Sequence, residues 1–252
     1  MIPIFNDKEM KIIKDNGQKL RKVMEATLAE VKPGVTLREI DQVAAKKIEE
    51  LGGEPSFKMV PHYYWATCLN LNEGVVHGIP DETLIKKGDY FSVDVGFYSQ
   101  GFHTDMAKTI KVGSEKEKGG SDKFLEAGKE ALEKAIEQVK PGNRVGHLSQ
   151  AMEKTIEKAG FQPVRNLTGH GVGRQLHQEP SIPCFVREEI EKTPLLEKGM
   201  VLAIEVIYTQ GEPALFVADD GWTIRTRDGK IAGLFEETVA VGANGPLILT
   251  RH

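Results

Sequence analysis

The sequence predicts an α+β domain made of two similar halves. Two observations predict it. Helical patterns accompany strand-like segments without regular βαβ alternation, and the chain partly repeats itself. The 252 residues can bury a sizeable core, and the composition is that of an ordinary globular protein. We therefore expect a single domain over residues 1–252.

Two helices are predicted at the start of the chain. The first begins near Asp7 and ends before Pro33-Gly34. The second begins at a capping box formed by Thr36 and Glu39, and Gly52-Gly53 ends it. Strand-like segments follow at about 65–71, 90–98 and 102–111.

The second of these strands has two unlike faces. Because side chains alternate along a strand, Asp94 shares its side with the small residues Ser92 and Gly96. A bound group could therefore lie against this carboxylate.

The second half follows a polar, glycine-rich segment. We predict that residues 113–121 are a linker between half-domains over approximately 1–112 and 122–245. Two helices are predicted near 122–139 and 145–159, and strands and loops follow to about residue 241.

The two halves share spacings. A Lys-Pro-Gly triplet stands 23 residues before a proline in each half, from Lys32 to Pro55 and from Lys140 to Pro163. A Lys-Gly pair precedes a strand carboxylate by 7 residues in each half, at Asp94 and at Glu205. Since ligand sites often lie between structural units, we expect one site at the interface of the halves.

Four carboxylates and one histidine are candidate metal ligands: Asp94, Asp105, His170, Glu205 and Glu236. Three of the carboxylates interrupt apolar runs that contain no lysine or arginine, where an unpaired charge is very costly. Four negative charges match two divalent cations better than one. Carboxylates combined with an imidazole suit Mn, Fe, Co or Zn.

A hairpin that turns at 99–101 would bring Asp94 and Asp105 together. An aspartate in a hairpin is usually a turn or cap residue, but the presence of His170, Glu205 and Glu236 favours the metal interpretation. The choice between two adjacent glutamates stays open. Glu236 and Glu237 point to opposite faces of a strand, and periodicity does not choose between them.

Several functional classes are disfavoured. A net charge of −4 argues against general affinity for nucleic acid or anionic membrane, and no apolar run approaches the roughly 20 residues of a membrane helix. Cys68 and Cys184 give no disulfide framework, and the N-terminus has no signal-peptide pattern. The chain also lacks a P-loop and the Gly-x-Ser-x-Gly elbow of serine hydrolases. We expect a cytoplasmic protein.

Six segments, in order along nearly the whole chain, resemble the signature blocks of type I methionine aminopeptidases in their short bacterial form. They are residues 72–80, 93–96, 103–105, 168–174, 204–205 and 235–238. The resemblance implies the duplicated "pita-bread" fold, in which helices cover a curved antiparallel sheet. Its pseudo-two-fold halves hold the metal site at their interface.

The resemblance also implies ligand roles. Asp94 would bind one metal, His170 and Glu205 the other, and Asp105 and Glu236 would bridge the two. The resemblance thereby favours Glu236 over Glu237 as the metal ligand.

Substrate-side roles follow from the same resemblance. His77 and His177 match the two histidines beside the substrate, and Glu205 is the expected general base. The methionine side chain would enter a slot lined by Tyr63, Cys68, Leu176 and Trp222.

The implied activity is hydrolytic removal of the N-terminal methionine from peptides and nascent polypeptides whose second residue is small. A hydroxide activated by two metals would attack the scissile carbonyl. We expect a monomer, and the ribosome is a candidate partner.

The chain departs from the family pattern at several positions: Val206, Leu234, Glu237, Leu176 and the segment Phe57–Tyr64. None removes a metal ligand, but they leave the strictness of the methionine preference open. A proline-specific or broader aminopeptidase of the same fold, a catalytically silent binding module and a purely structural metalloprotein are the alternatives.

Overall fold

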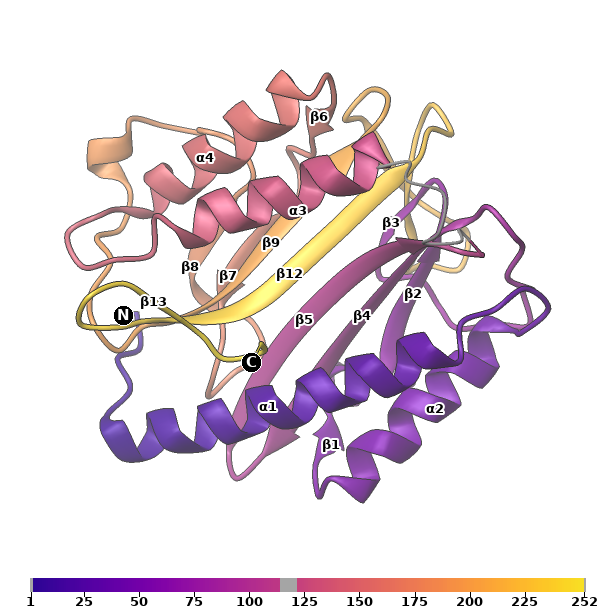
Figure 1. The fold of residues 1–252 in the computed structure, drawn as a ribbon, viewed down its shortest axis with the longest axis horizontal. Helices are drawn as coiled ribbons and strands as arrows, with labels where there is room; N and C mark the ends of the chain where they lie inside the picture. Colours follow the sequence, from indigo (N-terminus) through magenta and orange to yellow (C-terminus); the bar gives the residue numbers. More distant parts are fainter. Residues whose placement is uncertain (1, 114–121, 252) are drawn as a thin grey trace.

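Helices flank a large antiparallel sheet (Figure 1). The computed structural model describes residues 2–113 and 122–251. The α-helices within these residues are α1 (Asp7–Ala29), α2 (Leu37–Glu50), α3 (Lys123–Ile136) and α4 (Val145–Lys158). Two 3-10 turns are η1 (Ser56–Met59) and η3 (Ile190–Lys192).

Ten strands of the described residues form the main sheet. Its order is β1-β4-β5-β12-β9-β7-β8, while β2 pairs with β4, β6 with β9 and β13 with β12. A smaller sheet has the order β10-β11-β3. The strands are β1 (Glu54–Pro55), β2 (Thr67–Leu71), β3 (Gly74–Val76), β4 (Tyr90–Ser99), β5 (Phe102–Lys111), β6 (Gln162–Pro163), β7 (Thr168–Gly171), β8 (Gln178–Pro183), β9 (Val201–Thr209), β10 (Leu215–Val217), β11 (Ile224–Thr226), β12 (Ala232–Val241) and β13 (Pro246–Ile248).

Local sequence explains where the helices of the first half begin. The Thr36 hydroxyl accepts a hydrogen bond from the Glu39 amide at 3.2 Å, and the Glu39 carboxylate accepts one from the Thr36 amide at 2.8 Å. This capping box confirms the predicted start of α2. Asn6 and Glu9 form a second capping box at the start of α1.

Each pair of helices covers its own part of the sheet. Leu20 of α1 and Ile40 of α2 pack with Phe91 and Phe97 of β4 in one hydrophobic cluster. A larger cluster joins α3 and α4 to β9 and β12. Figure 1 shows the same division, with α1 and α2 beside β4 and β5, and α3 and α4 beside β9 and β12. The predicted α+β fold is confirmed.

The duplication seen in the sequence is also present in the structure. In each half, two helices lead into a two-residue strand that ends in proline, at Pro55 and at Pro163. Each short strand pairs with the long strand that carries a candidate ligand: β1 with β4, and β6 with β9. The matching spacings therefore mark matching structural positions.

The predicted linker over 113–121 falls almost wholly outside the described residues, so the half-domain boundaries stay a prediction. Val112, just before it, is buried in the cluster under α1 and α2. Among the described residues, none of the helices has both the length and the hydropathy needed to span a bilayer.

Candidate active site

The β4–β5 hairpin brings the two candidate aspartates to one cavity. The strands turn at Gln100 and Gly101, whose φ angles of 52° and 85° are both left-handed. Asp94 lies opposite Ala107, and Asp105 lies opposite Gly96, so both carboxylates project from the same face between small neighbours. Both line the cavity, as the hairpin prediction requires.

The second half supplies the other three candidate ligands. Glu205 of β9 lies directly opposite Glu236 of β12. His170 of β7 lies opposite Ala203, two residues before Glu205 and on the same face of β9. All three line the same cavity as the aspartates.

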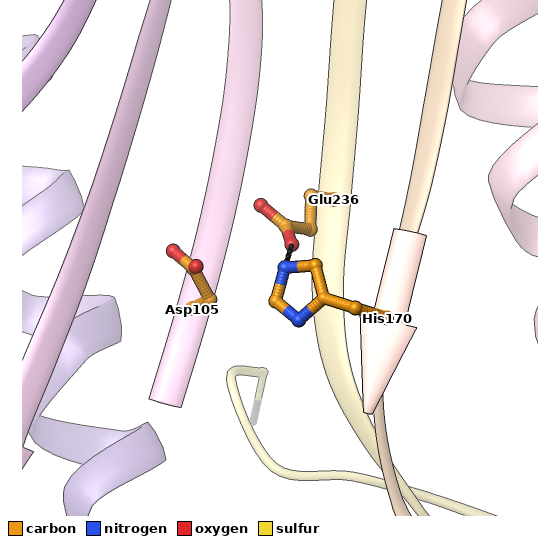
Figure 2. A group of neighbouring side chains, drawn as sticks. All are labelled: Asp105, His170 and Glu236. Atoms are coloured by element: carbon orange, nitrogen blue, oxygen red, sulfur yellow. Dashed lines mark ion pairs between the residues drawn. The ribbon is translucent and has the colours of Figure 1, made fainter. Parts of the chain in front are cut away.

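Three side chains from three strands form the tightest group (Figure 2). Ligand atoms of Asp105, His170 and Glu236 all lie within 4.8 Å of one another, which is close enough to hold one metal ion. His170 Nε2 is 3.9 Å from a Glu236 carboxylate oxygen. Its Nδ1 donates to the Gly171 carbonyl at 3.0 Å, because a carbonyl oxygen can only accept. Nε2 therefore keeps its lone pair, as a metal ligand must.

Burial makes the carboxylates difficult to ionise. It raises the pKa of Asp105 to about 7 and, with the negative charge of Asp105 added, that of Glu205 to about 8. The pKa values of Asp94 and Glu236 are raised by burial and by the neighbouring carboxylates. Burial lowers the pKa of His170 to about 4, so this ring is neutral near pH 7.

The site has the features expected of a metal centre. One oxygen of Asp94 and one of Asp105 are buried without a hydrogen-bond partner among the described residues. The described residues that line the cavity include no lysine or arginine. A set of four carboxylates and a neutral imidazole without a compensating cation fits divalent metal ions.

Two further histidines lie beside these residues. The His177 ring centroid is 4.5 Å from that of His170, and His77 lines the cavity after the end of β3. Burial lowers the pKa of both His77 and His177, and for His77 the proximity of His177 contributes. Both rings are therefore neutral near pH 7 and can donate one hydrogen bond each.

The other part of the cavity is apolar. Tyr63, Cys68 and Leu176 form a separate buried cluster with Phe57, and Trp222 packs against it. Cys68 lies opposite Asp94 in the β2–β4 ladder, so the apolar part begins beside the carboxylates. The whole cavity has a volume of about 330 Å³, and all eleven predicted site residues line it.

Sequence reasoning missed several parts of this wall. Phe57 and Val60 come from the segment 57–64, which departs from the family pattern and has no strand or helix periodicity. Residues 166–168 and Ile207 also contribute. Ile207 could have been found, because it is two residues after Glu205 and so shares its face of β9.

Because side chains alternate along β12, Glu236 and Glu237 project from opposite faces of the sheet. Glu236 lines the cavity, whereas Glu237 lies near the C-terminal segment on the other face. The Arg251 side chain donates from Nε to Glu237 at 2.6 Å, and the Thr250 hydroxyl also donates to Glu237. The open choice between the adjacent glutamates is thus resolved in favour of Glu236 as the residue at the cavity.

Comparisons with known protein families, sequences and structures agree on one family for this chain. Residues 11–243 match the model of metallopeptidase family M24. The chain is 39% identical to a methionine aminopeptidase of Aquifex aeolicus over 99% of both chains, and 37% identical to methionine aminopeptidase 1 of Bacillus subtilis over 100% of both. The crystal structure of a methionine aminopeptidase from Thermotoga maritima superposes with a TM-score of 0.94, at 37% identity and 100% coverage of both chains. The chain therefore belongs to the methionine aminopeptidases of metallopeptidase family M24, with the pita-bread fold of that family.

Proposed function

We propose that this protein removes the N-terminal methionine from peptides and nascent polypeptides whose second residue is small. One observation carries the proposal: a single cavity joins the five candidate metal ligands, two neutral histidines and an apolar slot. Full-length similarity to methionine aminopeptidases supports it.

We propose that the cavity holds two divalent cations. Asp94 would hold one and His170 with Glu205 the other, while Asp105 and Glu236 would lie between them. The closeness of Asp105, His170 and Glu236 supports part of this set, and four carboxylates balance two divalent charges. When bound, such ions keep the carboxylates ionised and lower the pKa of a water molecule towards neutrality. Mn, Fe, Co and Zn all suit this donor set.

Glu205 is the proposed proton carrier. Its carboxylate lines the cavity with the other candidate ligands, opposite Glu236 in the β9–β12 ladder. A carboxylate beside the attacking water can take a proton from it and return that proton to the leaving amine. Glu205 thus acts as general base and then as general acid.

His77 and His177 are the proposed substrate-side groups. Because both are neutral, each can donate a hydrogen bond without adding charge to the site. We assign His177, which is adjacent to His170, to the oxygen that becomes negative during attack. We assign His77 to the backbone next to the scissile amide.

The slot formed by Tyr63, Cys68, Leu176 and Trp222 is the proposed site for the methionine side chain. It is apolar, and burial raises the pKa of the Cys68 thiol so that no thiolate charge is present. A flexible thioether packs well against such aromatic and aliphatic walls.

A peptide panel tests the proposal. Metal-supplemented protein should cleave methionine from Met-Gly-headed peptides and leave Met-Lys-headed peptides intact. Cleavage of Leu-Gly-headed peptides would indicate a broader aminopeptidase, and cleavage before proline alone would indicate a proline-specific one. If no peptide is cleaved with any metal, the proposed function is wrong and the fold serves as a binding module.

Cytoplasmic location, a monomeric state and ribosome association stay predictions. Sedimentation with and without ribosomes tests the last two directly.

A further inference from the structure

The turn that carries His77 is held in an unusual backbone conformation. His77 has a φ of 58°, in the left-handed region that residues with a Cβ rarely adopt. The next residue lies so close to β2 that a Cβ added to Gly78 would be 2.0 Å from the Leu69 carbonyl oxygen. The Leu69 amide donates to the Gly78 carbonyl at 2.9 Å, which fixes the turn against β2.

Tyr63 contacts this turn from the apolar slot. Its hydroxyl lies between two backbone carbonyl oxygens, 2.8 Å from that of Thr67 and 3.2 Å from that of Gly78. The side chain is buried, and burial raises the pKa of the phenol, so the group stays a proton donor. The hydroxyl therefore links the start of β2 to the residue that follows His77.

The ring of Tyr63 belongs to the wall of the slot. It meets Trp222 edge to face at a centroid distance of 5.1 Å, and it meets Trp65 at 5.3 Å and Phe57 at 6.5 Å in similar geometry. One residue thus presents its ring to the cavity and its hydroxyl to the His77 turn.

We propose that Tyr63 is a positioning residue that couples filling of the slot to the placement of His77. A side chain that fills the slot packs against the Tyr63 ring and holds its hydroxyl on the Gly78 carbonyl. This contact keeps the left-handed turn, and with it the His77 imidazole, at the scissile amide. The proposal rests on the proposed function and adds a route by which the first residue of the substrate affects turnover as well as affinity.

Replacing Tyr63 by phenylalanine tests this coupling, since Tyr63→Phe keeps the ring and removes only the hydroxyl. We expect kcat for Met-Gly-headed peptides to fall about tenfold, with KM changed less than about twofold, because the slot keeps its shape. The preference in kcat for Met-Gly over Ala-Gly substrates should shrink as well. In a His77→Ala background the same substitution should lower kcat no further, because the positioned residue is missing.

Tyr208→Phe is the matched control. Tyr208 is also buried and donates to a backbone carbonyl, that of Phe124 at 2.6 Å, but it lies in the core under α3. This control should leave kcat unchanged in both backgrounds. Two results would overturn the inference without affecting the proposed function. One is an equal loss of kcat from Tyr63→Phe with and without His77. The other is an unchanged kcat in Tyr63→Phe when the wild-type protein is active. If the wild type cleaves no methionyl peptide, the proposed function fails and the inference falls with it.

Discussion

Among the residues of the candidate site, the carboxyl groups are the source of charge, and the histidines beside them are neutral near pH 7. Four carboxyl groups project into one cavity, and three nearby histidines have pKa values lowered by burial. The imidazoles therefore offer lone pairs or single protons and add no positive charge, so the proposed metal ions would have to balance the carboxylates. Each chemical role can be tested by a substitution that alters one group only.

Glu205→Gln is the most selective of these substitutions. The amide has nearly the same shape but cannot take up a proton, so we expect kcat to fall by about 10²–10⁴-fold. The fold should persist, because the substitution relieves repulsion between Glu205 and Asp105. Steady-state kinetics at saturating metal, with a melting curve of the same sample, measure both effects. Near-normal turnover by the Glu205→Gln variant would show that Glu205 is not the general base.

At the scale of elements, β12 has different functions on its two faces. One face carries Glu236 into the cavity, and the other carries Glu237 to Arg251 near the C-terminus. Arg251 also pairs with Glu133 of α3, so one guanidinium links β12, the C-terminal segment and a helix. Glu237, one of the positions at which the chain departs from the family pattern, thus has a structural partner of its own in this chain.

Arg251→Ala should destabilise the protein by about 1–3 kcal/mol, because it leaves the largely buried Glu237 without its cationic partner. Arg38→Ala is the matched control. The Arg38–Glu82 pair is exposed at both ends, and its loss should cost less than about 0.5 kcal/mol. Urea unfolding of the two variants beside wild type gives the comparison. Equal midpoints for Arg251→Ala and wild type would show that this contact contributes nothing.

The sequence revealed those parts of the site that depend on local pattern. Asp94 and Glu205 stand out because they interrupt apolar strands, and the Thr36–Glu39 capping box locates α2. It did not reveal Phe57 or Val60, because a single 3-10 turn and the residue after it are too short to show a periodicity from which side-chain direction can be predicted. The proposed role of Tyr63 depends on contacts between β2 and the turn after β3, which only the folded chain brings together.

At the scale of the whole molecule, the site lies where the two halves of the sheet meet. Asp94 and Asp105 come from the first half, and His170, Glu205 and Glu236 from the second. Metal ions that bind all five would therefore join the halves, and their removal should affect the stability of the entire fold.

The metal-free protein should become less stable as the pH rises from about 6.5 to about 8. The pKa values of Asp105 and Glu205 are raised to about 7 and about 8, so the folded state holds protons that the unfolded chain has already released. The buried histidines act in the opposite direction, but only below their ordinary pKa of 6.5. Melting temperatures of chelator-treated, dialysed protein across this window measure the effect. Added metal should reverse the slope, and a rising melting temperature without metal would contradict the assignment.

Metal stoichiometry measured together with turnover tests the central claim most directly. Metal-free protein would be titrated with Mn or Co while bound metal per chain and cleavage of a Met-Gly-headed peptide are followed in the same samples. We predict two bound ions per chain at saturation, activity that appears as the ions bind, and loss of both binding and activity in Asp105→Asn. Full turnover by the metal-free protein, or a folded wild type that binds no metal at this site, would contradict the account.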